Sequence, residues 1–128
     1  MTRCRSTLPT NSPGASPAFR LTAHRPAPDT GVVEIDGDLD LVTAPRVREL
    51  IAAEVAGTLT RLVIDLRGVR FLSATGLAAL EHSYLLATER GIVSTVRVAP
   101  GGRVLRVIRM LPVRFADALE LADRVDSP

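Results

Sequence analysis

The sequence predicts an α/β domain: a mixed β-sheet of four to five strands packed with α-helices. From residue 32 onward, short runs rich in β-branched residues alternate with segments of helical period. Gly and Pro stand at most of the joins between these segments, as they do between regular elements. The chain has 128 residues, of which 46% are hydrophobic, so one domain with one core is expected. Alternation of strands and helices favours a sheet that is partly parallel.

The first 17 residues differ in composition from the rest of the chain. Pro9, Pro13 and Pro17 stand there among Ser, Thr, Asn and Gly. Such a segment buries too little apolar surface to offset the entropy lost on ordering. We therefore expect a disordered leader at residues 1–17, followed by a single domain at residues 18–126.

Two strands are expected next, at residues 19–24 and 32–35. Phe19, Leu21 and Ala23 alternate with polar residues in the first strand, and Pro26 is expected to end it. Residues 29–31 read Asp-Thr-Gly, which is typical of a hairpin turn. The two strands are therefore predicted to pair antiparallel.

A first helix is predicted from Thr43 to Gly57. Thr43 is a candidate N-cap, and Pro45 fits the first turn, where its missing N–H costs nothing. One helical face is lined by apolar residues, namely Val47, Leu50, Ile51 and Val55.

The segment at residues 61–90 predicts a strand, a polar loop and a long helix. The apolar run at 62–66 suits a buried strand, in which Asp65 is expected to be structural. Arg67-Gly68 is expected to interrupt the chain before a second apolar piece at 69–72. Residues 73–76 then form a polar loop, and the helix after it buries Leu77, Leu80, Tyr84 and Ala87 and stops at Gly91. A helix N-terminus has unpaired N–H groups and partial positive charge, so this loop suits a hydroxyl cap, an anion or a phosphorylated side chain.

The last third of the chain predicts a fourth strand at 92–98 and a third helix. Pro100, Gly101 and Gly102 separate the two, and Pro112 ends the helix. Phe115 is expected to begin a short strand, and residues 116–124 have a helical pattern. The third helix carries Arg103, Arg106 and Arg109 at three-residue spacing. This stripe is either a solvated face or a dock for an acidic partner.

Several classes of function are disfavoured by composition and motif. All 16 basic residues are Arg, yet the net charge is only +2, and no nucleic-acid-reading pattern is present. No run approaches the ~20 apolar residues of a membrane span, and Cys4 has no partner for a disulfide, which fits a cytoplasmic protein. His24 and His82 lack metal-ligand spacing, and no Walker, dinucleotide or G-x-S-x-G motif occurs. We expect no cofactor, no metal and no catalysis.

Two stretches resemble a known family. Gly37-Asp38-Leu39-Asp40 with Thr43-Ala44-Pro45 is similar to the "GELD…TAP" segment of STAS domains. Residues 63–77, VIDLRGVRFLSATGL, resemble the "VVLDLSGVxFIDSSGL" segment of the same family. The similarity covers about residues 18–125, and it is to the bacterial anti-sigma factor antagonists in particular.

The resemblance implies a compact mixed sheet with helices and a role in protein binding. Such antagonists bind an anti-sigma factor, usually a GHKL-type serine kinase, and so free its sigma factor. The family's partner surface corresponds here to Ser73, Ala74, Thr75, Gly76 and Leu77, with Asp38 and Asp40 beside them. We expect no nucleic acid and no membrane insertion, and a monomer or weak homodimer.

The sequence departs from the family in this loop. The kinase phosphorylates the Ser after Asp in the family's "DSSG" loop, and a phosphatase reverses this. Ser73 corresponds to that Asp and Ala74 to the phosphorylated Ser, so the usual acceptor hydroxyl is missing. Either the antagonist is not switched off in this way, or Ser73 or Thr75 is phosphorylated instead, or the domain has another STAS role. The other roles are a cytosolic STAS subunit of a phospholipid-transport ABC complex and a small anion- or nucleotide-sensing module.

Overall fold

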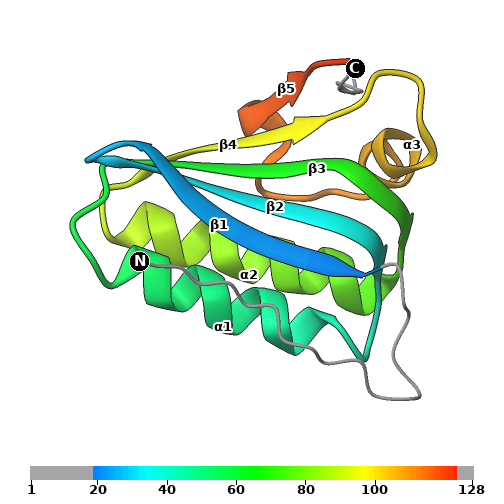
Figure 1. Ribbon diagram of the computed structural model, residues 1–128. Coiled ribbons are helices and arrows are strands. Elements are labelled where there is room, and N and C mark those ends of the chain that lie inside the picture. The colour runs from blue at the N-terminus through cyan, green and yellow to red at the C-terminus, as the bar shows by residue number, and fades with distance from the viewer. Residues whose placement is uncertain (1–18, 124–128) are drawn as a thin grey trace.

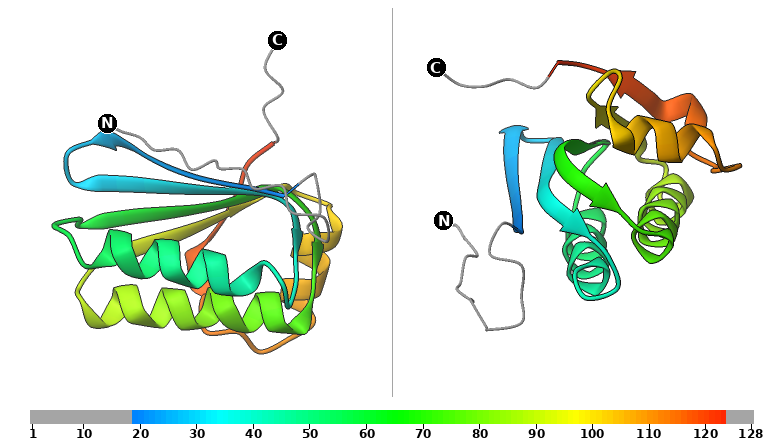
Figure 2. Two further views of the ribbon diagram at one scale, coloured as in Figure 1. Left: turned by 60° about the horizontal axis from the view of Figure 1, so that its bottom comes forward. Right: turned by 90° about the vertical axis from the view of Figure 1, so that its right-hand side faces the viewer.

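The computed structural model describes residues 19–123, so the expected leader at residues 1–17 lies outside the described residues. Five strands form one sheet, and the helices α1 and α2 lie side by side against one face of it (Figure 1). The shorter α3 lies at one end of the sheet (Figures 1 and 2). The elements in chain order are β1 (Arg20–Ala27), β2 (Thr30–Leu39), α1 (Ala44–Val55), β3 (Arg61–Leu72), α2 (Ala74–Glu89), β4 (Val93–Val98), α3 (Arg103–Arg109), the 3₁₀ turn η1 (Ala116–Ala118) and β5 (Leu119–Leu121).

The strand order is β1-β2-β3-β4-β5, and only the β1–β2 pair is antiparallel. The predicted mixed α/β sheet is therefore confirmed. The first strand, however, does not end before Pro26 but runs through it to Ala27. Because β1 is an edge strand with a register shift between His24 and Ala27, Pro26 removes no essential ladder bond. The turn is accordingly at Pro28–Asp29, and β2 already begins at Thr30.

The third strand is a single element of 12 residues, so the interruption expected at Arg67-Gly68 is wrong. Gly68 pairs with Asp36 of β2, and a Cβ atom at position 68 would overlap the Asp36 carboxylate. The glycine therefore makes room for a neighbouring side chain instead of turning the backbone. Asp65 consequently lies in the middle of β3 and not at its end.

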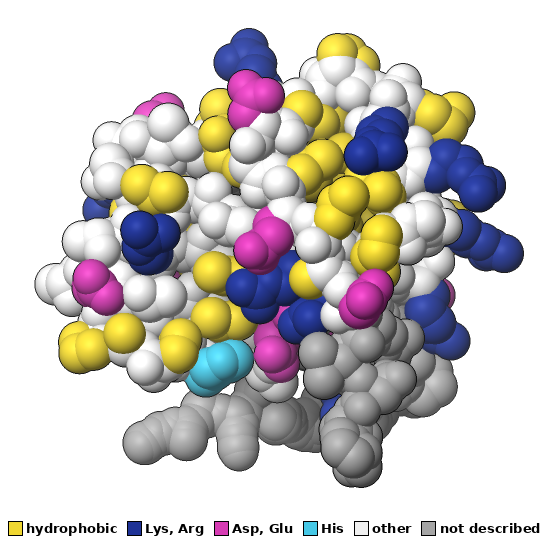
Figure 3. All heavy atoms as spheres, turned by 90° about the horizontal axis from the view of Figure 1, so that it is seen from above, with side chains coloured by type: hydrophobic (Ala, Val, Ile, Leu, Met, Phe, Trp, Pro, Cys, Tyr) yellow, Lys and Arg dark blue, Asp and Glu magenta, His cyan; other side chains and the backbone are white. Residues whose placement is uncertain are grey.

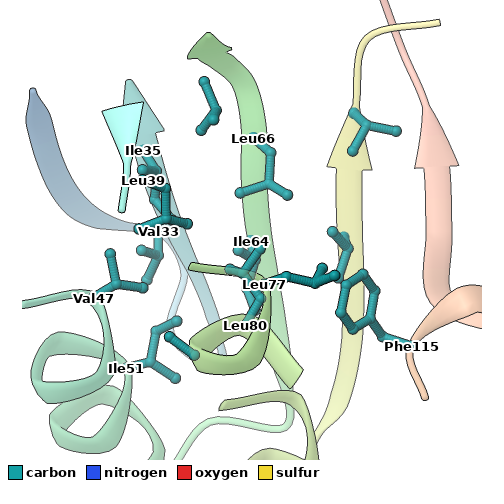
Figure 4. Packing of buried hydrophobic residues seen from close by; sticks show 14 of the residues in the cluster. Val33, Ile35, Leu39, Val47, Ile51, Ile64, Leu66, Leu77, Leu80 and Phe115 are labelled. Atoms are coloured by element: carbon teal, nitrogen blue, oxygen red, sulfur yellow. The ribbon is translucent and has the colours of Figure 1, made fainter. Parts of the chain in front are cut away.

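The core lies between the sheet and the two long helices, as Figure 4 shows from close by. The predicted apolar faces are confirmed: Val47, Ile51 and Val55 of α1 are fully buried, and Leu50 packs against the core. On α2, Leu77, Leu80 and Ala87 are buried, and Tyr84 is partly buried against the same cluster. The other buried side chains come mainly from β2, β3 and β4, namely Val33, Ile35, Leu39, Leu62, Ile64, Leu66, Val96 and Val98.

The end of the chain differs from its sequence prediction. Phe115 does not begin a strand but is a core side chain without exposed surface. Residues 116–124 are not a helix: within the described residues they form η1 and then β5, which pairs parallel with β4. Short apolar runs fit a helix or a strand equally well, and here the free edge of β4 decides. Ala122 N–H donates to the Val98 carbonyl and extends this pairing.

Candidate functional site

Two loops meet at the edge of the sheet where β2 and β3 end. Leu39 and Leu72, the last residues of these parallel strands, are paired. Ser73, the residue after β3, is tied to the end of β2, because its N–H donates to the Leu39 carbonyl oxygen over 3.0 Å. Residues 38–40 and residues 73–77, which the sequence placed at one site, therefore lie side by side.

Ser73 starts α2 as a side-chain cap. Its backbone is extended, and its Oγ accepts a hydrogen bond from the Gly76 N–H over 3.0 Å. Of the three uses that the sequence left open for this loop, the structure therefore shows a hydroxyl cap, and Ser73 provides it. Thr75 is exposed and its hydroxyl makes no hydrogen bond within residues 19–123, so it does not share that role.

Gly76 and Leu77 support the site from below. A Cβ atom at position 76 would overlap the Leu39 carbonyl oxygen, so only glycine lets α2 approach β2 this closely. The Leu77 side chain is buried in the core, as Figure 4 shows. Of the predicted contact residues in this loop, Ala74 and Thr75 are exposed, Ser73 is half-buried, and Gly76 and Leu77 offer no side chain to a partner.

Asp40 and Thr43 hold the loop between β2 and α1. Asp40 Oδ1 accepts from the N–H groups of Val42 and Thr43 at 3.0 and 3.1 Å. Thr43 occupies the N-cap position, but its hydroxyl does not cap α1; it donates to the Asp38 carbonyl over 2.8 Å and accepts from the Asp40 N–H. The predicted side-chain cap at Thr43 is therefore wrong, because the hydroxyl is used to close the preceding turn.

Asp38, unlike Asp40, has no side-chain hydrogen bond that holds it to the loop within residues 19–123. Its side chain is 36% exposed, and its nearest cationic neighbour, Arg70, lies 3.8 Å away and is 61% exposed. An ion pair this long and this exposed contributes little free energy. Asp38 is therefore available to an external partner, whereas Asp40 is committed to the loop.

Sequence reasoning missed the apolar side chains of this site. Leu41, Val42 and Phe71 are 71%, 66% and 52% exposed, and all three adjoin residues 38–40 or their paired positions on β3. The available signal was the pair Leu41-Val42 inside an otherwise polar loop. We call Leu41, Val42, Phe71, Ala74 and Thr75, together with Asp38, the strand-end surface. Exposed apolar side chains gathered in this way are typical of binding sites.

The buried carboxylate Asp65 is structural. Burial raises the pKa of Asp65, but hydrogen bonds from Arg67 and the charges of Arg67 and Arg97 outweigh this, and the net pKa is lowered. The Arg67 guanidinium donates to both carboxylate oxygens, at 2.8 and 3.0 Å. Asp65 is thus held ionised and fully engaged within the fold.

Two kinds of reactive group concern the described residues, a metal-ligand cluster and a Ser–His pair. No three His, Cys, Asp or Glu side chains gather as metal ligands within residues 19–123. His82 is exposed on α2 and lies roughly 13 Å along the helix from Ser73, beyond the reach of a nucleophile–base pair. No helix in the described part of the chain combines the length and apolarity of a membrane span.

Comparison with known proteins identifies the family. The model of the STAS domain matches residues 23–127 of the chain. The chain belongs to the STAS domain family. The two loops described above lie within residues 37–45 and 63–77, the segments that carry the sequence resemblance.

Similar proteins of this family are named as anti-sigma factor antagonists. RsfB of Mycobacterium tuberculosis (strain H37Rv), an anti-sigma-F factor antagonist, is 39% identical over 83 residues, or 62% of this chain. The chain spans 64% of the length of that relative. A crystal structure of an anti-sigma factor antagonist from Mycobacterium paratuberculosis has a TM-score of 0.63 and 27% identity, and covers 75% of this chain and 81% of its own.

The fold extends to more distant proteins. The Bacillus cell fate determinant SpoIIAA, in its phosphorylated form, has a TM-score of 0.64 over 80% of this chain and 91% of its own. Its 12% identity supports the fold alone. In the present STAS domain, the strand-end surface combines exposed apolar side chains with the partly exposed carboxylate of Asp38.

Proposed function

We propose that this STAS domain is an anti-sigma factor antagonist, which binds an anti-sigma factor in the cytoplasm and releases the sigma factor it holds. The proposal takes the partner to be a GHKL-type serine kinase, and it assigns no catalytic step to the antagonist, which acts as a monomer or weak homodimer. The 39% identity to RsfB and the 27% identity to the antagonist of Mycobacterium paratuberculosis support this role. The observation that carries it is the strand-end surface, where exposed apolar side chains lie at the ends of β2 and β3, next to the start of α2.

Ala74 gives this antagonist a particular property. It is exposed at the first residue of α2, the position that the resemblance assigns to the family's phosphorylated serine. Because Ala74 has no hydroxyl, no phosphoryl group with its charge of about −1.5 to −2 can be added there. We propose that partner binding is therefore not switched off by phosphorylation at this position.

The alternatives gain less support. An anion- or nucleotide-sensing module would use the free N–H groups at the start of α2, but Ser73 Oγ already accepts from the Gly76 N–H. A subunit of a transport complex would present the same fold, and its partner would be an ATPase of the transporter. Affinity capture from the native host with ATP or ADP separates these, since an anti-sigma kinase and a transporter ATPase are readily told apart by mass spectrometry.

The test of the interface is Ala74→Glu. The longer, charged side chain should weaken binding of the cognate anti-sigma factor at least about tenfold in titration calorimetry, through steric overlap and charge. Ala53→Glu is the matched control, because Ala53 is also an exposed alanine and lies near the C-terminal end of α1, away from the loop at residues 38–43. Unchanged affinity for Ala74→Glu would remove the start of α2 from the interface.

The same preparation tests the missing acceptor. After incubation with the cognate kinase and ATP, the wild-type chain should gain no phosphoryl group by intact mass, whereas Ala74→Ser should gain one. A phosphoryl group on the wild-type chain that peptide mapping locates at Ser73 or Thr75 would contradict the constitutive antagonist.

A further inference from the structure

The arginines of α3 concentrate positive charge in one part of the chain. Between Ala99 and Ala116 there are four arginines and no acidic residue. Since the whole chain has a formal net charge of +2, the remainder carries −2. Arg103, Arg106 and Arg109, here called the α3 arginine face, are all exposed, while Val104, Leu105 and Ile108 on the same helix are buried.

Unlike four other arginines, those of the α3 arginine face make no ion pair in the described part of the chain. Arg25, Arg67, Arg70 and Arg97 each contact a carboxylate within 4 Å, at distances from 2.8 to 3.8 Å for the nearest pair. Within residues 19–123, no arginine of the α3 arginine face has an ion-pair partner or a side-chain hydrogen bond. Like charges three residues apart on a helix repel one another, so the spacing itself does not stabilise α3.

The helix dipole accounts for only part of the pattern. Arg106 and Arg109 lie in the last turn of α3, where a cation is favourable. Arg103 is the first residue of the helix, at its positive end, where a cation is unfavourable. A stripe selected for helix stability would therefore not begin with Arg103, and a role outside the fold explains all three residues together.

Exposed apolar side chains adjoin the arginines. Met110 and Leu111 directly follow α3 and are 73% and 45% exposed. In Figure 3, arginines gather beside hydrophobic side chains on the side of the molecule that carries α3. Arg and Met are enriched at protein interfaces, where acidic side chains are depleted. The combination fits an acidic partner segment that also carries apolar residues.

The position of α3 links it to the strand-end surface. Figures 1 and 2 place α3 at the same end of the molecule as the start of α2, and α3 packs against β3. A partner bound at the start of α2 would therefore extend toward α3. The two surfaces differ in charge: Asp38 of the strand-end surface has Arg70 3.8 Å away, whereas the α3 arginine face carries positive charges alone.

We propose that the α3 arginine face, with Met110 and Leu111, is a second docking surface that binds an acidic, partly apolar segment of the anti-sigma factor. This inference rests on the proposed function. The patch lacks aromatic side chains on which bases could stack, and the rest of the chain is net negative, so a protein partner fits it better than a nucleic acid.

The second docking surface is tested with a charge-changing variant that should lower binding without lowering stability. Arg103→Glu puts an anion at the start of α3, where the helix dipole favours it, so stability should not fall. Combined with Arg106→Gln, it should lower affinity for the purified cognate anti-sigma factor about tenfold at low salt, mainly through slower association. Raising the salt from about 50 to about 300 mM should weaken wild-type binding but change the double variant much less.

Arg90→Glu is the matched control. Arg90 is exposed, follows α2 at the end opposite Ser73, and undergoes the same Arg-to-Glu change as Arg103. Its affinity should stay within about twofold of wild type, because surface charges beyond a Debye length are largely screened. If the double variant binds with the same affinity and salt dependence as wild type, the second docking surface is wrong, while the proposed function stands.

Two other outcomes are distinguishable. If the wild-type chain binds no anti-sigma factor of its host, the proposed function fails, and this inference fails with it. If the double variant keeps its affinity for the anti-sigma factor but loses binding to RNA or to vesicles of phosphatidylglycerol, the arginines serve a polyanion, which also overturns the inference.

Discussion

Ser73 and Gly76 stand three residues apart and fix the start of α2 by different means. The Ser73 hydroxyl accepts from the Gly76 N–H, and the missing side chain of Gly76 lets the helix contact the Leu39 carbonyl. One residue supplies an acceptor and the other supplies space. The exposed residues between them, Ala74 and Thr75, are thereby presented on a fixed turn.

A pair of hydroxyl deletions tests this division of roles. Ser73→Ala should lower the free energy of unfolding by about 1 kcal/mol, because the Gly76 N–H loses its acceptor. Thr75→Ala, in the same loop, should change it by less than about 0.5 kcal/mol, since that hydroxyl is exposed. Urea denaturation of both variants measures the difference, and equal losses would show that the cap bond does not matter.

The residues of the site could be predicted from the sequence where the cause is local. Ser73 was identifiable as a cap because an N-cap and its acceptor role depend on a few neighbouring residues. The role of Thr43 could not be predicted in this way, because its hydroxyl donates to the carbonyl of the earlier residue Asp38 instead of capping α1. The exposure of Phe71 could not be read either, since it depends on the register between β2 and β3.

At the level of elements, a ladder of charges links three neighbouring strands. Asp65 of β3 pairs across the strands with Arg97 of β4, and Arg97 pairs with Glu120 of β5. The Arg97 Nε donates to Glu120 at 2.8 Å, and its Nη1 lies 3.9 Å from Asp65. Arg67 completes the group by binding Asp65 through both carboxylate oxygens. The ladder helps to hold the short β5 at the edge of the sheet.

Asp65→Asn should make the free energy of unfolding vary less with pH in the acidic range. Near neutral pH the variant should lose about 2 kcal/mol, because hydrogen bonds from Arg67 to a charged acceptor are weakened. The lowered pKa of Asp65 means that its contribution is present above the ordinary pKa of aspartate, about 4, and is lost as the pH falls through the folded-state value. The difference between variant and wild type should therefore narrow below about pH 4.

Chemical denaturation of both proteins between pH 7 and pH 3 measures this. Glu120→Gln is a suitable control, since Glu120 is 49% exposed and its single ion pair should contribute less than about 1 kcal/mol. A constant difference between Asp65→Asn and wild type over the whole range would mean that the ionised carboxylate is not what stabilises β3.

The elements that were mispredicted are those decided by tertiary contacts. Gly68 has the sequence character of a break, yet it continues β3 because its neighbour Asp36 occupies the space above it. Residues 119–121 have too few side chains to define a period, and they become a strand because β4 leaves an edge open. The long helices α1 and α2 were predictable, since each repeats its apolar spacing over several turns.

At the scale of the whole molecule, the last described part of the chain closes the core. After α3 the chain returns to the sheet, and Arg114 N–H donates to Glu81 of α2 over 2.7 Å. Phe115 then packs against Tyr84 with ring centroids 6.2 Å apart and planes tilted by 56°. This residue joins the segment that carries β5 to the helix that carries the proposed partner surface.

Phe115→Ala should therefore destabilise the whole domain. Its side chain is fully buried, so truncation should cost about 3–5 kcal/mol from lost burial and the cavity left behind. Phe71→Ala is the internal control, because Phe71 is 52% exposed and its loss should cost about 1 kcal/mol or less. In calorimetry Phe115→Ala should have a clearly lower Tm than Phe71→Ala. In binding measurements, Phe71→Ala should be the weaker of the two.

Phe71 lies on the strand-end surface, so its variant should fold normally and bind the anti-sigma factor more weakly. Phe115→Ala should bind with near wild-type affinity under conditions where it remains folded, since its side chain reaches no surface. If Phe71→Ala destabilised the fold as much as Phe115→Ala, the exposed ring would be part of the core and not of a binding surface. The two phenylalanines thus separate what maintains the STAS fold from what the fold presents to its partner.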